Sequence, residues 1–190
     1  MGASGRELVG GLTCCIALMA ACSPMTASTK YTPRAAPVAH APQMACRMRV
    51  LEIVDDRMDP TILGSVGGRT VHAPPDAQAW MRSVMGGLNR LGVAVEFGDA
   101  DAGSAGLAAR AELKTAWVSS ETTAKTASVV LGFRYFQAGT LIKAADYRGS
   151  ISATNWSSTQ DEIQRMVDRA FDQVLAQAAA DILAACPTRS

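Results

Sequence analysis

Hydrophobic and polar residues alternate with period two in three segments of the second half of the chain. Successive side chains of a β-strand point to opposite faces of a sheet, so this pattern predicts three strands with one covered and one wetter face. Such alternation is typical of an antiparallel sheet. The covered set is Leu107, Ala109, Ala111, Leu113 and Trp117, then Ala127, Val129, Leu131, Phe133 and Tyr135, then Ala145, Tyr147, Gly149, Ile151 and Ala153.

Two further segments repeat their apolar residues every three or four positions, which predicts amphipathic helices. The first is expected to begin after Asp76, a good N-cap, and to end at Gly92, a residue type that commonly terminates helices. The second is expected from the capping box Thr159–Glu162 to about Ala185, before Pro187. Their apolar faces are Trp80, Met81, Val84, Met85, Leu88 and Leu91, then Ile163, Met166, Val167, Ala170, Phe171, Val174, Leu175, Ala178 and Ile182.

Shorter apolar segments add strands before the three alternating ones. Residues 47–55 (RMRVLEIVD) and Val93–Phe97 carry the β-branched and apolar residues that strands favour. Asp55-Asp56-Arg57 predicts a polar turn in which Arg57 pairs with a carboxylate, and the glycine-rich residues 62–75 predict an irregular surface loop. The expected fold class is therefore α+β, a two-layer sandwich of a mainly antiparallel sheet with two amphipathic helices on one face.

The N-terminus has the pattern of a secretion signal. Arg6 gives a weakly positive start, and Leu8–Ala21 is almost entirely apolar or small but shorter than the roughly 20 residues that span a bilayer. Met19-Ala20-Ala21-Cys22 then resembles a lipobox, in which the cysteine thiol takes up diacylglycerol and a peptidase cuts before it. We expect residues 1–21 to be a signal peptide and Cys22 to be the lipidated first residue. An ordinary signal peptide with a chance cysteine is the alternative.

The residues after the lipobox predict a location and a tether. Ser23 follows the cysteine with no aspartate there, which by resemblance to enterobacterial sorting implies the periplasmic face of the outer membrane. Residues 23–43 are rich in Pro, Ala, Ser and Thr without hydrophobic periodicity, so they cannot bury a core and would reach roughly 60 Å if extended. The expected organisation is a signal peptide over 1–21, the lipidated cysteine and a flexible tether over 22–44, and one periplasmic α+β domain over 45–190.

Charge and composition narrow the classes of partner. The 190 residues carry a formal net charge of +1, and their Lys and Arg are scattered, which argues against nucleic-acid binding. The expected partners are the membrane, through the lipid anchor, and an envelope protein of unknown identity.

Candidate catalytic and metal-binding residues are few. His40 lies in the tether and His72 in the irregular segment, without metal-ligand spacing, so exposed loop histidines are the better interpretation. The acidic residues of 55–59 fail the calcium-loop pattern, whose final glutamate would fall at Val66. Gly64–Gly68 lacks the ending of a phosphate loop, and no serine nucleophile motif occurs. We expect no enzymatic activity, metal or cofactor.

The cysteines of the mature chain suggest a disulfide. Cys14 and Cys15 leave with the signal and Cys22 is acylated, so Cys46 and Cys186 remain. Disulfides persist in an oxidising periplasm, which favours pairing of these two, and two separate reduced thiols are the alternative.

The order and spacing of four short motifs resemble the YajG family of bacterial lipoproteins, whose members are mostly uncharacterised. The motifs are Asp55-Asp56-Arg57, Leu91-Gly92, Tyr147-Arg148-Gly149 and Asp181-Ile182. The resemblance covers most of the mature domain and implies an envelope lipoprotein with a small α/β fold, similar to auxiliary lipoproteins of lipid transporters and of cell-wall enzymes. It brings no catalytic residues to this chain. The glycine-rich residues 64–68 and the cysteine pair depart from the family pattern.

The expected function is that of a membrane-anchored, non-catalytic periplasmic lipoprotein acting as an envelope binding or accessory protein. An auxiliary lipoprotein subunit of an ABC-type lipid transport system is the alternative, and it rests on fold-level analogy. An anchored hydrolase would need a buried histidine–carboxylate pair near a serine.

Overall fold

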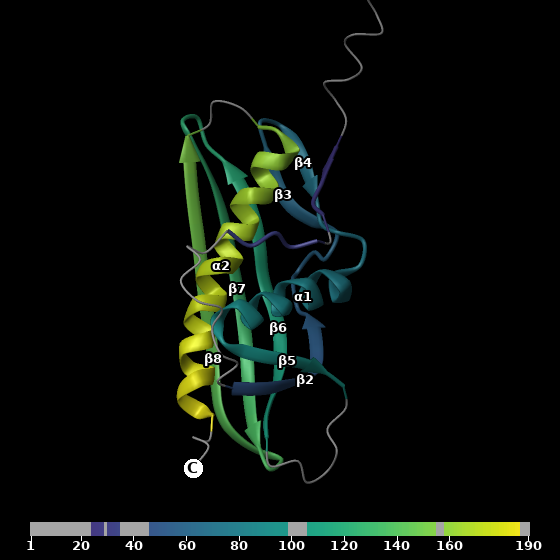
Figure 1. The fold of residues 1–190 in the computed structure, drawn as a ribbon. Coiled ribbons are helices and arrows are strands. Elements are labelled where there is room, and N and C mark those ends of the chain that lie inside the picture. Colours follow the sequence, from purple (N-terminus) through teal and green to yellow (C-terminus); the bar gives the residue numbers. More distant parts are fainter. Residues whose placement is uncertain (1–23, 29, 35–45, 99–105, 155–157, 187–190) are drawn as a thin grey trace, which may run out of the picture.

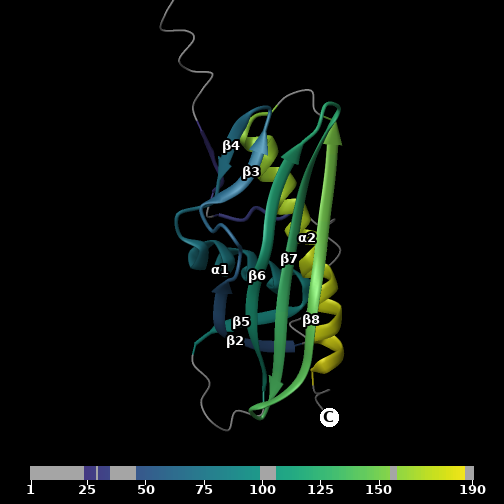
Figure 2. The ribbon, with the colours of Figure 1, turned by 180° about the vertical axis from the view of Figure 1, so that it is seen from behind.

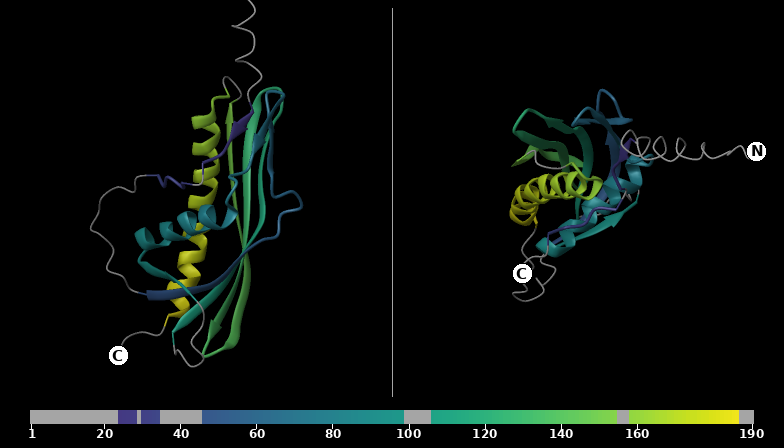
Figure 3. Two further views of the ribbon diagram at one scale, coloured as in Figure 1. Left: turned by 90° about the vertical axis from the view of Figure 1, so that its right-hand side faces the viewer. Right: turned by 90° about the horizontal axis from the view of Figure 1, so that it is seen from above.

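One sheet of eight strands carries both helices on one face in the computed structural model of the chain (Figure 1). Residues 24–28, 30–34, 46–98, 106–154 and 158–186 are described. The predicted α+β two-layer sandwich is confirmed, and Figure 3 shows the helices and the sheet as its two layers. The elements are β1 (Met25–Thr26), β2 (Cys46–Asp55), β3 (Ile62–Val66), β4 (Arg69–His72), α1 (Ala77–Gly86), the 3₁₀-helix η2 (Gly87–Leu91), β5 (Val93–Phe97), β6 (Leu107–Ser120), β7 (Ala124–Gln137), β8 (Thr140–Thr154) and α2 (Gln160–Ala185).

The three long strands β6, β7 and β8 form an antiparallel meander, as their alternating pattern predicts. In β7 every residue of the predicted covered set is buried, because the strand lies between two neighbours and beneath α2. In β8, Tyr147 and Gly149 are buried and the other members are half-buried, since this strand forms an edge of the sheet.

The remaining strands extend the sheet beyond β6 in two separate groups. β2 pairs in parallel with the first half of β6, with β5 on its outer side. β3 pairs in parallel with β6 near Val118, followed outward by β4 and then β1. Figure 2 shows the face of β6, β7 and β8 that the helices leave uncovered.

Helix α2 packs along the sheet through its predicted apolar stripe, all of which is buried. The side chain of Thr159 accepts a hydrogen bond from the backbone N–H of Glu162 and begins the helix as predicted. A Cβ atom at Gly149 would overlap the backbone carbonyl oxygen of Ala170, so glycine lets α2 lie directly on β8. No helix within the described residues is both long and apolar enough to cross a membrane.

Helix α1 begins at the predicted cap, where Asp76 accepts a hydrogen bond of 2.8 Å from Ala79 N. Its last turns tighten into η2, which ends at Gly92 with a left-handed φ of 87°. Leu91 was predicted on the buried face but is 37% exposed, because the three-residue repeat of η2 rotates it away from the sheet.

The prediction of an irregular loop over residues 62–75 is wrong. β3 and β4 form an antiparallel hairpin joined by Gly67 and Gly68, both with positive φ. Two glycines with positive φ make the turn type that best matches the twist of paired strands. His72 consequently lies half-buried at the end of β4 and is not an exposed loop residue.

The prediction of a free tether is wrong for the described part of residues 24–34. Met25 and Thr26 form β1, and Met25, Ala27 and Tyr31 are buried at 2%, 7% and 5% exposure. A few apolar side chains at suitable positions, together with hydrogen bonds from the domain, dock this segment although its overall composition is that of a linker.

Candidate functional site

A groove of about 470 Å³ lies beside β6 where β3 begins. Its volume is within the range of ligand and partner sites in proteins. We call it the Trp117 groove, and it is lined by Arg57, Met58, Asp59, Ile62, Lys114, Thr115, Ala116 and Trp117. Met58 is fully exposed and Trp117 is 49% exposed, so two large apolar side chains face solvent together.

A β-bulge in β6 turns Trp117 outward. Leu113 pairs with Leu131 but Thr115 pairs with Val130, so Lys114 is an extra residue in the strand. After an extra residue every later side chain changes face. Ala116 and Val118 are therefore buried, and Trp117, predicted on the covered face, lies on the open face of the sheet instead.

Gly64 pairs with Val118, next to Trp117 on β6. Its φ is +124°, and a Cβ atom there would overlap the carbonyl oxygen of Val118 and contact the Trp117 ring. The glycine thus allows β3 to approach β6 closely while the indole stays above it.

Arg57 forms the buried polar part of the groove wall. Its Nε and Nη2 each donate 2.7 Å hydrogen bonds to the carboxylate of Asp55, and Nη2 also donates to Pro60 O at 2.9 Å. This bidentate pair is the carboxylate pairing predicted for Arg57. The guanidinium also lies 5.7 Å from the centre of the Trp80 ring, and its buried Nη1 has no hydrogen-bond partner among the described residues.

The charged side chains that line the groove are Arg57, Asp59 and Lys114. Hydrogen bonds from the Thr61 hydroxyl and backbone N–H lower the pKa of Asp59. Asp59 enters no ion pair among the described residues, whereas Lys114 is held by Asp146 at 2.7 Å, a bond that raises the pKa of the lysine. Of these three lining charges, the Asp59 carboxylate is therefore the one without an ion pair in the described part of the chain.

A second site holds the N-terminal segment on the domain. The ring of Tyr31 packs edge-on against Phe171, its hydroxyl donates to Asp172, and its backbone N–H donates to Ser83 Oγ at 3.0 Å. Thr32 N donates to Asp168 at 3.3 Å.

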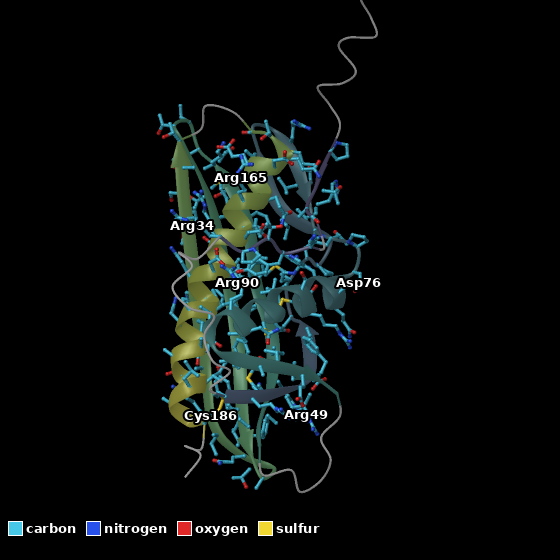
Figure 4. The ribbon with its side chains drawn as sticks, viewed as in Figure 1. Arg34, Arg49, Asp76, Arg90, Arg165 and Cys186 are labelled. Atoms are coloured by element: carbon cyan, nitrogen blue, oxygen red, sulfur yellow. A yellow bond between two sulfur atoms is a disulfide. The ribbon has the colours of Figure 1, made fainter. Side chains whose placement is uncertain are left out.

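The same contacts continue to the end of this segment. Arg34 N donates to Asp172 at 3.1 Å, and the Arg90 side chain donates to the carbonyl of Arg34. Figure 4 places Arg34 and Arg90 beside each other near the middle of the molecule. We call Ser83, Arg90, Asp168 and Asp172 the N-terminal clamp.

Asp168 is unusual among the carboxylates of the clamp because it is 2% exposed. Burial raises its pKa to about 6, although hydrogen bonds from Gln164 and Thr32 oppose the rise. The attachment of the segment therefore involves a group that titrates near neutral pH.

A hydrogen-bonded chain connects β7, β8 and α2 near the other end of the molecule. Tyr135 donates to Tyr147 at 3.1 Å, Tyr147 donates to Asp181 at 2.6 Å, and Lys143 pairs with Asp181 at 2.7 Å. Burial raises the pKa of Tyr147 to about 12, and the bond from Lys143 lowers that of Asp181. Tyr147 and Asp181, taken above from two separate motifs, thus contact each other and fix α2 to the sheet.

The structure joins Cys46 and Cys186 by a disulfide, with Cα atoms 5.8 Å apart. This separation lies within the roughly 7 Å that a disulfide allows. The bond connects the start of β2 to the end of α2, and Figure 4 labels Cys186 there.

The other residues singled out from the sequence lie apart from one another. Cys22 and His40 fall outside the described residues. His72 lies on β4, and within the described part of the chain no group of three or more His, Cys, Asp or Glu side chains is arranged to hold a metal ion.

Sequence reasoning missed both the Trp117 groove and the N-terminal clamp. Strict alternation in β6 assigned Trp117 to the core, and the interruption of that alternation at Lys114-Thr115 was the signal for a bulge. For the clamp, the signal was Tyr31, an aromatic residue within a segment otherwise composed like a linker.

The fold resembles that of several solved bacterial proteins. A Xanthomonas campestris protein of the DUF330 family superposes with a TM-score of 0.56 at 13% identity, covering 85% of this chain and 95% of that one. An uncharacterized protein superposes with a TM-score of 0.50 at 12% identity, over 84% of this chain and 99% of that one. A minor lipoprotein from Acinetobacter baumannii gives a TM-score of 0.46 at 11% identity, over 78% and 99%.

By sequence, the chain matches no family model and no curated protein. At 12–13% identity the structural likeness extends to the fold alone: a two-layer α+β domain shared with a DUF330 protein.

Proposed function

We propose that the chain is a lipid-anchored, non-catalytic envelope lipoprotein of the YajG type that binds a partner protein in the Trp117 groove. The short apolar signal ending in Met-Ala-Ala-Cys supports anchorage at Cys22, and Ser23 supports the periplasmic face of the outer membrane as the location. The shared fold with a DUF330 protein is compatible with this assignment.

The outward turn of Trp117 is the observation that carries the binding role. Exposed apolar area costs roughly 25 cal/mol per Å² relative to burial, and here a tryptophan, a fully exposed methionine and Ile62 are grouped together. Tryptophan is enriched among the residues that dominate binding energy at interfaces. Binding of a partner over these three side chains would bury their apolar surface and so stabilise the complex.

The polar groups of the groove indicate what the partner presents. Asp59 gives the groove a negative charge that enters no ion pair among the described residues, and this charge complements a lysine or arginine. The occupant is therefore a protein segment with an apolar side chain next to a basic one.

The same groups suit binding better than acid–base catalysis. A general acid or base works best with a pKa near the operating pH. In the groove the pKa of Asp59 is lowered and that of Lys114 is raised, so both shifts move these groups away from neutrality.

Photo-cross-linking in living cells tests the binding role. A photoreactive amino acid replaces Met58, and the matched control replaces Leu141, which is 52% exposed on β8. We expect a discrete protein adduct from position 58, none from position 141, and loss of the adduct when Trp117→Ala is added. Equal adducts at both positions, or an adduct indifferent to Trp117→Ala, would contradict the proposal. A phospholipid adduct at position 58 would instead favour the lipid-transport alternative.

Metabolic labelling tests the anchor separately. A clickable fatty acid should mark the chain, and Cys22→Ser should abolish the mark and release the protein from the membrane fraction. Labelling that persists in the Cys22→Ser variant would remove the basis for anchorage at this residue.

A further inference from the structure

Residues 25–27, which follow Cys22 closely in the sequence, are fastened to the sheet. Met25 pairs with Val71 and Thr26 pairs with His72, both in parallel. Ala27 N donates to His72 O at 3.0 Å, so the pairing continues beyond the two residues of β1.

Helix α2 holds the same segment from the other side. Gln160 Nε2 donates to Thr26 O at 2.8 Å, and Ser28 N donates to Gln164 Oε1 at 2.8 Å. The folded domain therefore begins three residues after the expected lipidation site.

The direction of β1 decides where the anchor leaves the domain. β4 runs away from the Gly67-Gly68 turn, and β1 runs parallel to β4, so the chain preceding Met25 leads back toward that turn. Three residues span at most about 10 Å, and three residues also separate Val71 from Gly68. The chain therefore enters β1 from the side of the turn, and a residue three positions before Met25 can be at most about 10 Å from it.

We propose that the domain rests with one particular end against the lipid bilayer. This proximal end consists of the Gly67-Gly68 turn, the β6–β7 turn at residues 121–123 and the first turn of α2. This proposed orientation rests on the proposed lipidation of Cys22. Figures 1 and 3 show these parts together at one end of the elongated molecule, with the β7–β8 turn at the opposite end.

The parts of the proximal end are connected to one another. Gly67 N donates to Ser120 Oγ at 3.0 Å, which ties the β3–β4 turn to the end of β6. The buried Lys125 of β7 pairs with Glu162 of α2 at 2.6 Å. This end therefore meets the bilayer as one surface.

The N-terminal clamp keeps this arrangement from loosening. A free segment over residues 23–43 would separate the domain from the lipid by up to about 60 Å. With Tyr31 buried and residues 32 and 34 bonded to Asp168 and Asp172, the first residues of that segment are held on the domain. The three residue steps between the proposed anchor and Met25 then allow a separation of at most about 10 Å.

The chemistry of the proximal end suits lipid headgroups. Gly67, Gly68, Thr122 and Thr123 are exposed and small or polar, so they can lie at the surface without inserting. Acidic and basic side chains both occur nearby: Asp161 lies in the first turn of α2, and Arg165 follows on the same helix (Figure 4). The anchor and not net charge therefore sets the orientation, which is expected to be the same in zwitterionic and anionic vesicles.

Fluorescence quenching on the acylated, full-length mature protein tests the orientation. Thr122→Cys reports on the proximal end and Thr140→Cys on the distal end; both threonines are exposed and adjoin a β-turn. Because Cys22 is acylated and Cys46 is joined to Cys186, the introduced thiol is the single labelling site. Each labelled variant is reconstituted into phosphatidylcholine vesicles, without and with phosphatidylglycerol, that contain headgroup spin-labelled lipid.

We expect strong fluorescence quenching of the label at position 122 and at least fivefold weaker quenching of the label at position 140. β6 alone is about 45 Å long, so the two ends differ clearly in depth. Quenching at neither position in vesicle-bound protein, equal quenching at both, or stronger quenching at 140 would overturn the orientation. Failure of the protein to bind vesicles, with Cys22→Ser behaving identically, would overturn the proposed anchorage instead.

Discussion

Removal of the disulfide between Cys46 and Cys186 should lower stability by a large and calculable amount. The bond closes a loop with a sequence separation of 140 residues. In the chain-entropy model a loop of this length restricts the unfolded chain by about 5 kcal/mol at 25 °C. The Cα separation of 5.8 Å is near the most common value for disulfides.

Urea denaturation of the mature domain measures this effect. We compare the oxidised protein, the reduced protein and the Cys46→Ala/Cys186→Ala variant, following far-ultraviolet circular dichroism. The oxidised protein should be more stable by up to about 5 kcal/mol, and the reduced protein should behave like the double variant. Identical midpoints for oxidised and reduced protein, or two free thiols in periplasmic material by mass spectrometry, would refute the reasoning.

Three further predictions concern the core, the groove and the clamp. Phe133→Ala should cost about 3–5 kcal/mol in urea denaturation because the ring is 1% exposed, whereas Trp117→Ala should cost about 1 kcal/mol because half of the indole already faces solvent. Gly64→Ala should destabilise by more than about 2 kcal/mol, since its Cβ would overlap backbone at a positive φ; the control Gly86→Ala, where space is open, should be neutral or stabilising. Asp168 has a folded pKa of about 6, raised by burial, so its protonated form stabilises the fold below about pH 4 and this contribution is lost as pH rises to 6. Asp168→Asn should remove that part of the pH dependence in denaturation curves collected from pH 4 to 7, and an unchanged profile would contradict the assignment.

The long strands show how far a local pattern can predict structure. In β7 the alternation is unbroken, and each predicted core residue is buried. In β6 the same rule holds to Leu113 and then fails at Trp117, because one extra residue at Lys114 reverses the faces. Period-two reasoning is therefore reliable within a regular strand and loses its register at a bulge.

Contacts between residues distant in sequence account for the other differences between the sequence-based predictions and the structure. The parallel pairing of β2 and β3 with β6 depends on which strands meet in space, and alternation within one strand carries no information on its neighbours. Docking of the N-terminal segment likewise depends on Gly87, where a Cβ atom would clash with Tyr31 and Leu175. The sequence around Gly87 does not indicate that this glycine makes room for Tyr31, which is 56 positions earlier in the chain.

The position of Trp117 along β6 connects the two proposals. Trp117 lies three residues before the end of β6 at Ser120, so the groove is about 10 Å from the level of the proximal end. If that end rests on the bilayer, the groove opens sideways, close to the headgroups, and a partner must approach to within a few tens of ångströms of the lipid. A protein that is itself membrane-bound meets this condition continuously, whereas a freely diffusing periplasmic protein does so during encounters. Weakening the clamp with Tyr31→Phe, which removes the hydroxyl bonded to Asp172, should therefore reduce both the quenching at position 122 and the yield of the Met58 adduct. If the adduct were lost while quenching stayed intact, the clamp would be acting on the groove without moving the domain, and the link between orientation and binding would fail.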